Sequence, residues 1–313
     1  MTARHHHYLS QCYLKGFTKG GSKKSKLTVV DFKEKKMFPT IPRNVGGIRD
    51  FNRVDVEGVD QNVVEKSYAE FEGKAAIALK NVQESLELEG KNKEYILNLI
   101  ALLAVRSPEQ RENTRQFTAQ LAEKIMDLSL ATKERWESQL AQMKADGYEP
   151  DGDLSYEDMK EFHESKRYKI EVVKERHIEM ELFGVEAILP SLHDRNWLLI
   201  RSTDESGPFI TTDHPVNLTW KEPDKVPPFY RYSPGFGLKG THVYFPLSRN
   251  LSLLGEFEGK KGLIEATKHL VAVLNSKMLT FAFRQIYAPN INFFFLGRDR
   301  SIVDGSKIFK EIA

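Results

Sequence analysis

Tyr95-Ile-Leu-Asn-Leu-Ile-Ala-Leu-Leu-Ala-Val105 is the longest apolar run of the 313-residue sequence, and Asn98 is its polar interruption. The run is well short of the ~20 residues that a membrane-spanning helix needs. Its side chains are apolar on nearly every face of a helix, which is typical of a helix surrounded by other elements of a soluble fold. The sequence therefore predicts a central buried helix here and no contact with a membrane.

Helical patterns lie on both sides of this run. Apolar residues recur every three or four positions from about Asp60 to Leu86, which predicts an amphipathic helix that Gly90 terminates. The central helix then begins near Asn92. Ser107-Pro108 predicts either a kink or a cap followed by a new helix with proline at its first position. We expect three more helices, a polar one over 109–144, a short one opened by Ser155, and one over 170–189 that stops at Pro190.

Strand patterns are confined to the two ends of the chain. β-Branched and aromatic residues bounded by turn residues predict strands rather than helices. The expected strands are 27–32, 37–41, 197–201, 209–212 with its extension 216–220, 241–247, 251–257 and 292–297, with a helix over 266–286 and a turn-rich loop over 44–51. The fold class is therefore α+β, a helical middle packed against a mainly antiparallel sheet built from N-terminal and C-terminal segments. We expect one domain over 1–313, with a basic β-rich segment 1–59, a helical region 60–190 and a β-rich region 191–313.

Composition excludes several classes of protein. Hydrophobic residues make up 40% and aromatic residues 11% of the chain, enough for a sizeable core. A charged share of 29% and a mean hydropathy of −0.46 are typical of a soluble globular protein and not of a disordered chain, a collagen or a disulfide scaffold. The single cysteine, Cys12, cannot form an internal disulfide, and the first residues lack the apolar core of a secretory signal. We therefore expect a cytoplasmic protein.

The charge is unevenly distributed along the chain. The net charge is +2, but residues 1–44 hold ten Lys and Arg against two acidic residues, so this segment carries +8 and the remainder −6. Such asymmetry indicates that the N-terminal part meets an anion, which can be a nucleic acid, a nucleotide or an acidic face of the same protein. The alternative is a solvated lysine-rich hairpin that protects an edge strand.

His5-His6-His7 is the densest group of residues with catalytic potential. In a strand, His5 and His7 point to one face and His6 to the other. Histidine titrates near neutral pH and is the commonest metal ligand, so His6 or His7 is a candidate general base, phosphate contact or ligand. No cysteine pair or His-Glu-x-x-His motif accompanies the three histidines. The alternative is a set of solvated residues at a chain terminus.

Two carboxylates and an arginine lie in the helical region. Glu65 and Glu72 are seven residues apart, so they lie at nearly the same angle on the flank of the apolar stripe of their helix. Such a pair can bind a divalent cation or orient a histidine or arginine, or it can be an ordinary solvated flank. Arg106 ends the apolar helix, where an unpaired charge is costly, so it needs a partner. Candidate partners are Glu65, Glu72, Asp213 or a phosphate of a ligand.

Thr211-Thr212-Asp213-His214-Pro215 is the clearest local signal of the second half. It lies between two strand-forming runs, so Asp213 is expected at a strand end, as a base, a ligand or an acid that orients a histidine. The alternative is a turn in which Asp213 caps its own backbone. Cys12 lies among Tyr and Leu side chains, which favours a buried packing role over a nucleophile. The chain contains no P-loop, GxGxxG, GxSxG or CxxC motif, so NTPase, dinucleotide and α/β-hydrolase functions lack support.

The N-terminal motif resembles that of a bacterial family known as domain of unknown function 4238. The family pattern is His-His-Tyr-x-Pro-Gln-x-Tyr-Leu-x-x-Phe, and this chain has His6-His7-Tyr8-Leu9-Ser10-Gln11-Cys12-Tyr13-Leu14-Lys15-Gly16-Phe17. The chain departs from the pattern at Ser10, where proline is usual, and at Cys12, where a large apolar residue is usual. Further matches are Glu65…Glu72, Arg106-Ser107-Pro108, Thr212-Asp213-His214-Pro215, Pro246-Leu247-Ser248 and Asn275…Arg284.

The resemblance implies no established activity, but it implies that polar residues from distant segments converge in one pocket. The expected catalytic set is His6, His7, Glu65, Glu72, Arg106 and Asp213, and substrate contacts are expected from Arg4, Gln11, Arg111 and His214. The predicted function is a hydrolase acting on a phosphodiester or nucleotide, nuclease-like and associated with defence, with Mg²⁺ or Mn²⁺ as a possible cofactor. The alternative is a non-catalytic module that binds nucleic acid or protein and whose polar cluster is structural.

Overall fold

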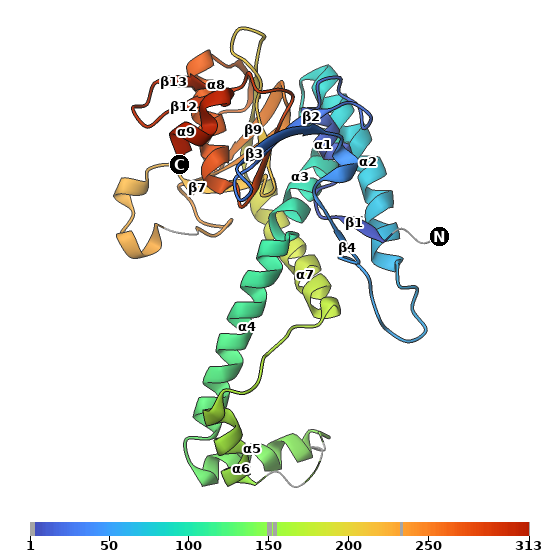
Figure 1. Cartoon of the computed structure of the whole chain (residues 1–313), viewed down its shortest axis with the longest axis vertical. Helices are drawn as coiled ribbons and strands as arrows, with labels where there is room; N and C mark the ends of the chain where they lie inside the picture. The colour runs from blue at the N-terminus through green and yellow to red at the C-terminus, as the bar shows by residue number, and fades with distance from the viewer. Residues whose placement is uncertain (1–3, 149–151, 153–154, 232–233, 313) are drawn as a thin grey trace. The chain divides into compact units, whose positions relative to one another are not determined.

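The structure is a computed structural model that describes residues 4–148, 152, 155–231 and 234–312. The chain divides into two compact units (Figure 1). The larger unit consists of Met1–Pro108 and Ile178–Ala313, and the smaller unit is Glu109–His177. The single-domain organisation expected from the sequence stays a prediction.

Short and long helices cover the sheets of the larger unit. Its α-helices are α1 (Gln11–Leu14), α2 (Val63–Ser85), α3 (Gly90–Val105), most of α7 (Lys174–His193), α8 (Lys268–Phe281) and α9 (Ile308–Ile312). The long helices α2 and α3 lie side by side (Figure 1). Every residue of α3 from Leu99 to Ala104 is buried, which confirms the central helix. Among the described residues, no helix is long and apolar enough to cross a membrane.

The strands form a five-stranded sheet, a four-stranded sheet and two-stranded pairs. The orders are β10-β5-β9-β8-β7, β3-β2-β11-β6, β1-β4 and β12-β13, and every pairing is antiparallel except β10 with β5. The strands are β1 (His5–His7), β2 (Leu27–Asp31), β3 (Lys36–Thr40), β4 (Gly47–Arg49), β5 (Asn196–Arg201), β6 (Thr211–Thr212), β7 (Asn217–Trp220), β8 (Thr241–Ser248), β9 (Leu251–Glu256), β10 (Gly262–Glu265), β11 (Gln285–Ala288), β12 (Phe294–Leu296) and β13 (Ile302–Asp304). N-terminal β2 pairs with C-terminal β11, so the α+β class and the mainly antiparallel sheet from both chain ends are confirmed.

Both faces of the five-stranded sheet are covered. One core cluster joins α1, α2 and α3 to residues such as Leu199 and Phe245. A second cluster packs α8 against Ile200 and Tyr244. Each is next to Leu199 or Phe245 in its strand, so its side chain points to the opposite face of the sheet. Consequently every residue of β8 is buried, the pattern of a strand covered on both sides.

The segment that follows the histidines turns into a helix and enters the core. The hydroxyl of Ser10 caps α1 by accepting the backbone N–H of Tyr13 at 3.3 Å. Tyr13 is fully buried; its ring stacks on Phe245 at 5.1 Å, and its hydroxyl lies 2.7 Å from Thr211 Oγ1. This packing fixes the chain that immediately follows β1.

Several predicted helix ends are wrong. Leu86, not Gly90, terminates α2 in the left-handed conformation (φ 58°), while Gly90 is the first residue of α3. The helix expected to stop at Pro190 continues through it as α7 (Lys174–His193). Proline removes only its own N–H from the ladder, and its carbonyl still accepts from Asp194 N–H at 3.0 Å.

Three predictions of where strands, helices and loops extend are also wrong. β6 and β7 belong to different sheets, so the second does not extend the first. The helix expected over 266–286 ends at Phe281, and its last residues form β11, because that segment pairs with β2 and β6. The loop expected over 44–51 contains β4, which pairs with the histidine strand.

The smaller unit is helical. The polar helix expected over 109–144 is divided into α4 (Pro108–Ser129) and α5 (Lys133–Ala145), because Thr132 caps a new helix by accepting Arg135 N–H. Pro108 begins α4, which confirms the second of the two alternatives for that step. Ser155 caps α6 (Tyr156–Ser165), as expected.

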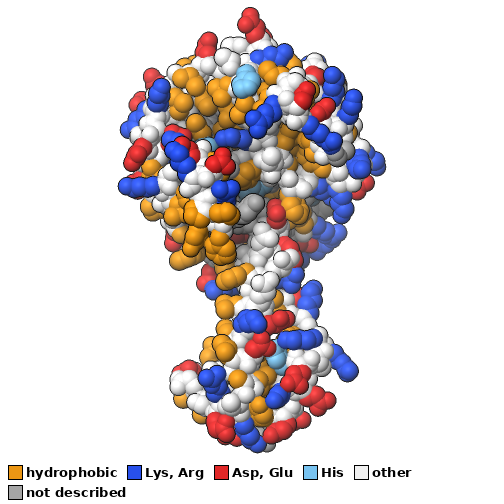
Figure 2. Space-filling model, turned by 90° about the vertical axis from the view of Figure 1, so that its left-hand side faces the viewer, with side chains coloured by type: hydrophobic (Ala, Val, Ile, Leu, Met, Phe, Trp, Pro, Cys, Tyr) orange, Lys and Arg blue, Asp and Glu red, His pale blue; other side chains and the backbone are white. Residues whose placement is uncertain are grey.

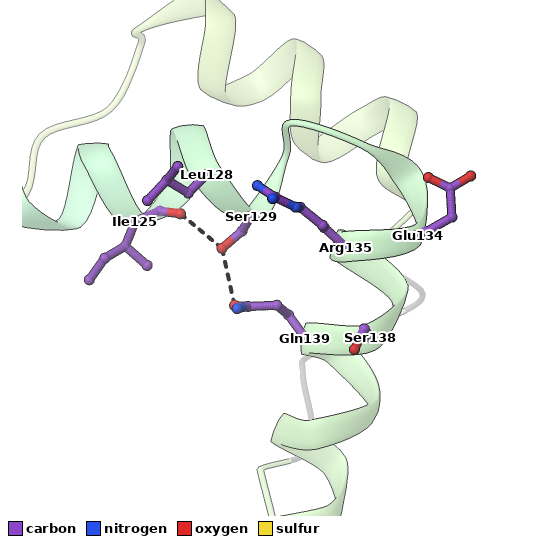
Figure 3. A pocket seen from close by; sticks show the side chains of 7 residues that line it. All are labelled: Ile125, Leu128, Ser129, Glu134, Arg135, Ser138 and Gln139. Carbon is purple, nitrogen blue, oxygen red and sulfur yellow. Dashed lines mark hydrogen bonds between the residues drawn. The ribbon is translucent and has the colours of Figure 1, made fainter.

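The smaller unit contains a pocket of about 700 Å³ between α4 and α5. Ser129 Oγ donates to the carbonyl of Ile125 and lies 3.1 Å from Gln139 Oε1 at its wall (Figure 3). Ile125 and Leu128 give the pocket an apolar side, and it contains none of the predicted site residues.

Candidate functional site

The three histidines form β1, the N-terminal strand that pairs with β4. His5 and His7 share one face, where their rings meet edge to face with centroids 5.0 Å apart. His6 points to the other face and is fully buried. The predicted alternation is confirmed, and His6 is not a solvated terminal residue. The partner strand has Gly47 opposite His7, where a Cβ would lie 2.4 Å from the His5 ring, so the close approach of the two strands depends on glycine.

His6 is connected to Glu65 through one residue. Its Nδ1 accepts the backbone N–H of Asn52 at 2.9 Å, and the Asn52 side-chain amide donates to Glu65 Oε2 at 2.8 Å. An acceptor Nδ1 places the proton of a neutral imidazole on Nε2. This chain of hydrogen bonds ties the histidine strand to the first turns of α2.

His7 has one ring nitrogen engaged with the backbone. Its Nε2 lies 3.2 Å from the carbonyl oxygen of Arg43, which can only accept, so Nε2 is the donor and Nδ1 carries the lone pair of the neutral ring. Burial is the main cause that lowers the pKa of His7; the charge of Arg106 lowers it further and that of Glu65 opposes the change. His7 is therefore a neutral base near pH 7.

Arg106 is a buried cation, with 1% of its side chain exposed. Its Nη2 lies 3.4 Å from Glu72 Oε1 and 3.3 Å from the carbonyl oxygen of Tyr8, and its guanidinium carbon lies 4.3 Å from the centre of the Tyr68 ring. Of the candidate partners predicted from the sequence, Glu72 is the one that pairs with Arg106. The Nε and Nη1 of Arg106 have no hydrogen-bond partner among the described residues. A buried guanidinium with two unused donors is suited to bind a planar or tetrahedral anion.

Glu72 carries the carboxylate that faces this cation. Burial raises the pKa of Glu72 and the nearby charge of Glu65 adds to the increase, while Arg106 opposes it. The interaction between Glu65 and Glu72 shows that the two carboxylates share one flank of α2, as their spacing predicted.

Tyr8 connects the histidine strand to the four-stranded sheet. Its hydroxyl interacts with that of Tyr287, which donates to Gln285 Oε1 at 3.0 Å. Burial raises the pKa of Tyr8 to about 12, and the negative charge of Asp213 acts in the same direction. Tyr8 is therefore a protonated hydroxyl at neutral pH.

Asp213 holds the turn between α8 and β11. Its Oδ1 accepts the backbone N–H of Phe283 at 2.9 Å, and its Oδ2 accepts those of Arg284 and Gln285 at 2.7 and 2.9 Å. Burial raises the pKa of this carboxyl, against the effect of the three hydrogen bonds. Both oxygens are engaged, so Asp213 positions this turn. It caps a distant segment rather than its own backbone.

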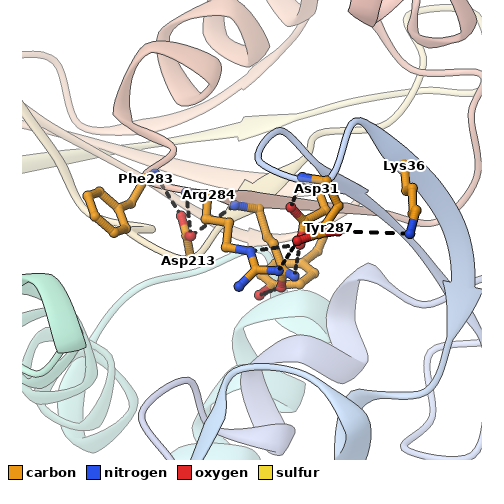
Figure 4. A network of polar contacts seen from close by, with 8 residues as sticks. Asp31, Lys36, Asp213, Phe283, Arg284 and Tyr287 are labelled. Atoms are coloured by element: carbon orange, nitrogen blue, oxygen red, sulfur yellow. Dashed lines mark hydrogen bonds and ion pairs between the residues drawn. The ribbon is translucent and has the colours of Figure 1, made fainter.

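Asp31 is a buried acid that sequence reasoning missed. Its Oδ2 accepts from Arg284 Nε at 2.8 Å and from Gln285 Nε2 at 2.6 Å (Figure 4). Burial would raise its pKa, but the hydrogen bonds from Gln285, the Glu34 backbone and Arg284 together lower it. An aspartate at the end of an apolar strand was the available signal. Asp31 and Asp213 both bind Arg284 and Gln285, Asp31 through their side chains and Asp213 through their backbone N–H groups, and so fix the start of the strand that carries Tyr287.

The remaining predicted contacts are dispersed. Arg4 is exposed and lies 4.0 Å from Asp50, and Gln11 begins α1. Arg111 belongs to the smaller unit. The His214 ring stacks on Phe281, its burial lowers its pKa, and its Nδ1 has no partner among the described residues. Cys12 is buried, as expected, and burial raises its pKa.

No group of three or more His, Cys, Asp or Glu side chains in the part of the chain that the structure describes is arranged to hold a metal ion. Glu65 Oε2 accepts instead from the Asn52 amide, and Glu72 Oε1 lies 3.4 Å from Arg106 Nη2.

The fold defines an α+β protein in which a buried arginine, Arg106, pairs with Glu72 and acts electrostatically on His7 of the N-terminal strand. The chain belongs to the protein family of unknown function DUF4238, whose model matches residues 5–290. Comparison with curated proteins gives no match. Comparison with solved structures gives none either.

Proposed function

We propose that this chain is a hydrolase acting on a phosphodiester or nucleotide, with Arg106 binding the phosphoryl group and His7 as the general base. The observation that carries the proposal is the guanidinium of Arg106, which is 1% exposed and has Nε and Nη1 without partners among the described residues. A positive charge in a desolvated site stabilises the developing charge on a phosphoryl group far more than it would in water.

The other members of the cluster have supporting roles in this proposal. Nδ1 of His7 takes the proton of the attacking water, while Nε2 stays bonded to the carbonyl of Arg43. His6 and Glu65 hold the histidine strand through Asn52, and Glu72 orients Arg106. Asp213 acts indirectly, by fixing the segment that carries Tyr287.

The test is turnover by the full chain on labelled RNA, DNA and nucleotides, with and without Mg²⁺ or Mn²⁺. His7→Gln and Arg106→Lys are each expected to lower turnover by about 10²-fold or more. His269→Gln is the matched control, because His269 is an exposed histidine on α8. Absence of turnover on every substrate, or equal turnover in the His7 and His269 variants, would overturn the proposal.

A binding module without catalysis is the second candidate. Seven lysines are exposed between η1 (Lys15–Phe17) and the first residue of β3, so the +8 segment presents its charge to solvent. They are Lys19, Lys23, Lys24, Lys26, Lys33, Lys35 and Lys36. Nucleic-acid binding that weakens steeply with salt, without cleavage, would favour this candidate.

A further inference from the structure

A second polar site lies in the larger unit, built from β7, β8 and α8. The Nζ of Lys277 on α8 lies 3.0 Å from Nε2 of His242 on β8, and the same nitrogen lies 2.7 Å from Thr219 Oγ1 on β7. His242 is 7% exposed. None of these residues belongs to the histidine–arginine cluster described above.

This lysine opens into a pocket of about 600 Å³. Leu218, Trp220 and Phe281 give the pocket an apolar and aromatic lining. The segment with η3 (Pro223–Lys225) and η4 (Pro228–Tyr230) follows β7 and supplies part of the pocket wall. This segment lies on the side of the larger unit that faces the viewer in Figure 2, where apolar side chains gather. A planar, largely apolar ligand fits such a lining.

Two further cations line the same pocket, Lys221 and Arg231. Lys221 is neutralised by Glu256, 3.0 Å from its Nζ. Arg231 donates to the backbone carbonyls of Val226 and Asp224, which hold its guanidinium in place, and no carboxylate of the described residues pairs with it. The pocket therefore combines an apolar body with a positive charge suited to a phosphate or carboxylate.

The surroundings of Lys277 favour a nucleophilic amine. Burial lowers its pKa, and the charge of Glu256 opposes the change. Burial, together with the charges of Lys277, Lys221 and Arg195, lowers the pKa of His242 to about 4, so its imidazole is neutral at pH 7. A desolvated lysine beside a neutral base is the arrangement in which the uncharged amine becomes accessible.

We propose that this pocket binds a small aromatic aldehyde carrying a phosphate or carboxylate group, and that Nζ of Lys277 forms an imine with it. The amine lone pair attacks the carbonyl carbon and forms the C–N bond. The two protons of the amine move to the carbonyl oxygen, which leaves as water, and His242 Nε2 relays one of them. No oxidant or reductant takes part. Arg231 binds the anionic group of the ligand.

The probe is pyridoxal 5′-phosphate, with borohydride reduction and mapping of modified lysines by mass spectrometry on the full chain. At limiting reagent, Lys277 is expected to be labelled several-fold faster than Lys268, an exposed lysine on the same helix. Lys277→Arg retains the positive charge and should remove this label alone. Labelling of Lys277 no faster than that of Lys268 would overturn the nucleophile assignment.

The anion site is tested separately with Arg231→Ala and with pyridoxal, which lacks the phosphate. The variant should slow labelling by pyridoxal 5′-phosphate to the rate seen with pyridoxal, while labelling by pyridoxal stays unchanged. Equal rates for both aldehydes in the unmodified chain would overturn the role of Arg231. Neither result depends on hydrolase activity.

Discussion

Arg106 Nη2 and Glu72 Oε1 lie 3.4 Å apart, with 1% of the arginine side chain and 22% of the glutamate side chain exposed. The cation is thus more deeply buried than the anion that neutralises it. If the carboxylate charge is removed, the positive charge of the buried guanidinium has no partner, and the folded state is destabilised.

Glu72→Gln should lower the free energy of unfolding by about 3 kcal/mol, because it leaves the buried Arg106 charge unpaired. Glu70→Gln is the control, since the pair of Glu70 with Lys74 is exposed on the same helix and its loss should leave the free energy of unfolding nearly unchanged. Urea unfolding measures both. Equal losses in the two variants would contradict the buried pair.

Asp213→Asn should destabilise the chain by about 1.5–3 kcal/mol, because three backbone N–H groups lose an ionised acceptor and the new amide presents its own donors to them. Asp194→Asn, at an exposed aspartate after α7, is the control and should be nearly neutral. The measurement is chemical denaturation at pH 7. A change at Asp213 as small as that at Asp194 would show that the turn does not need this charge.

The proposed base predicts the pH dependence of turnover. Burial lowers the pKa of His7 below its ordinary value of 6.5, so the ring keeps its lone pair to a lower pH than a solvated histidine. On acidification, kcat/KM should fall with a midpoint below 6.5. A midpoint above 6.5, or an unchanged midpoint in the residual activity of His7→Gln, would exclude His7 as the titrating group.

His242 predicts a pH dependence of stability. Its folded pKa of about 4 lies below the unfolded value of 6.5, so the unfolded chain binds the proton first as the pH falls. The contribution of His242 is complete above pH 6.5 and is lost between 6.5 and 4, by about 3 kcal/mol. Between pH 6.5 and 4, the free energy of unfolding should fall by about 3 kcal/mol more in the unmodified chain than in His242→Gln. Parallel curves would contradict the buried neutral imidazole.

Gly46→Ala should be more destabilising than Gly21→Ala, although both glycines are left-handed, with φ of 65° and 67°. At Gly21 nothing lies within 4 Å of the new Cβ, so the cost is the backbone strain of about 1 kcal/mol. At Gly46 the Cβ would lie 2.8 Å from Leu9 Cβ, which adds about 1–3 kcal/mol of overpacking. Thermal unfolding of the two variants compares these costs directly.

The sequence pattern predicted helices and strands correctly where a segment showed a single clear periodicity of apolar residues. The central helix, the β2–β3 hairpin and the Ser155 cap follow from apolar spacing and capping chemistry. Helix ends failed at Gly90 and Pro190, because a Leu in the left-handed conformation and a tolerated proline depend on the packing around them.

The residue types of the candidate site could be predicted from the sequence, but the role of each residue was harder to predict. Residue types indicated His7, Glu72 and Arg106; the fold pairs Arg106 with Glu72, and Arg106 acts on His7 electrostatically. Asp31 was missed and Asp213 was given a chemical role, because the distinction between a catalytic and a positioning carboxylate depends on which donors face it. Asp213 faces donors from residues 283–285, about 70 positions away, and two of the donors to Asp31 come from Arg284 and Gln285, more than 250 positions away.

The sequence by itself determined the α+β class, the buried central helix and the alternation of the three histidines, because each depends on side-chain periodicity within a few residues. Only the tertiary structure decided that His6 is buried against Asn52, that Glu72 is the partner of Arg106, and that Lys277 meets His242. Those contacts join segments separated by 34 to 46 positions, and their hydrogen bonds and desolvation exist only once the chain has folded.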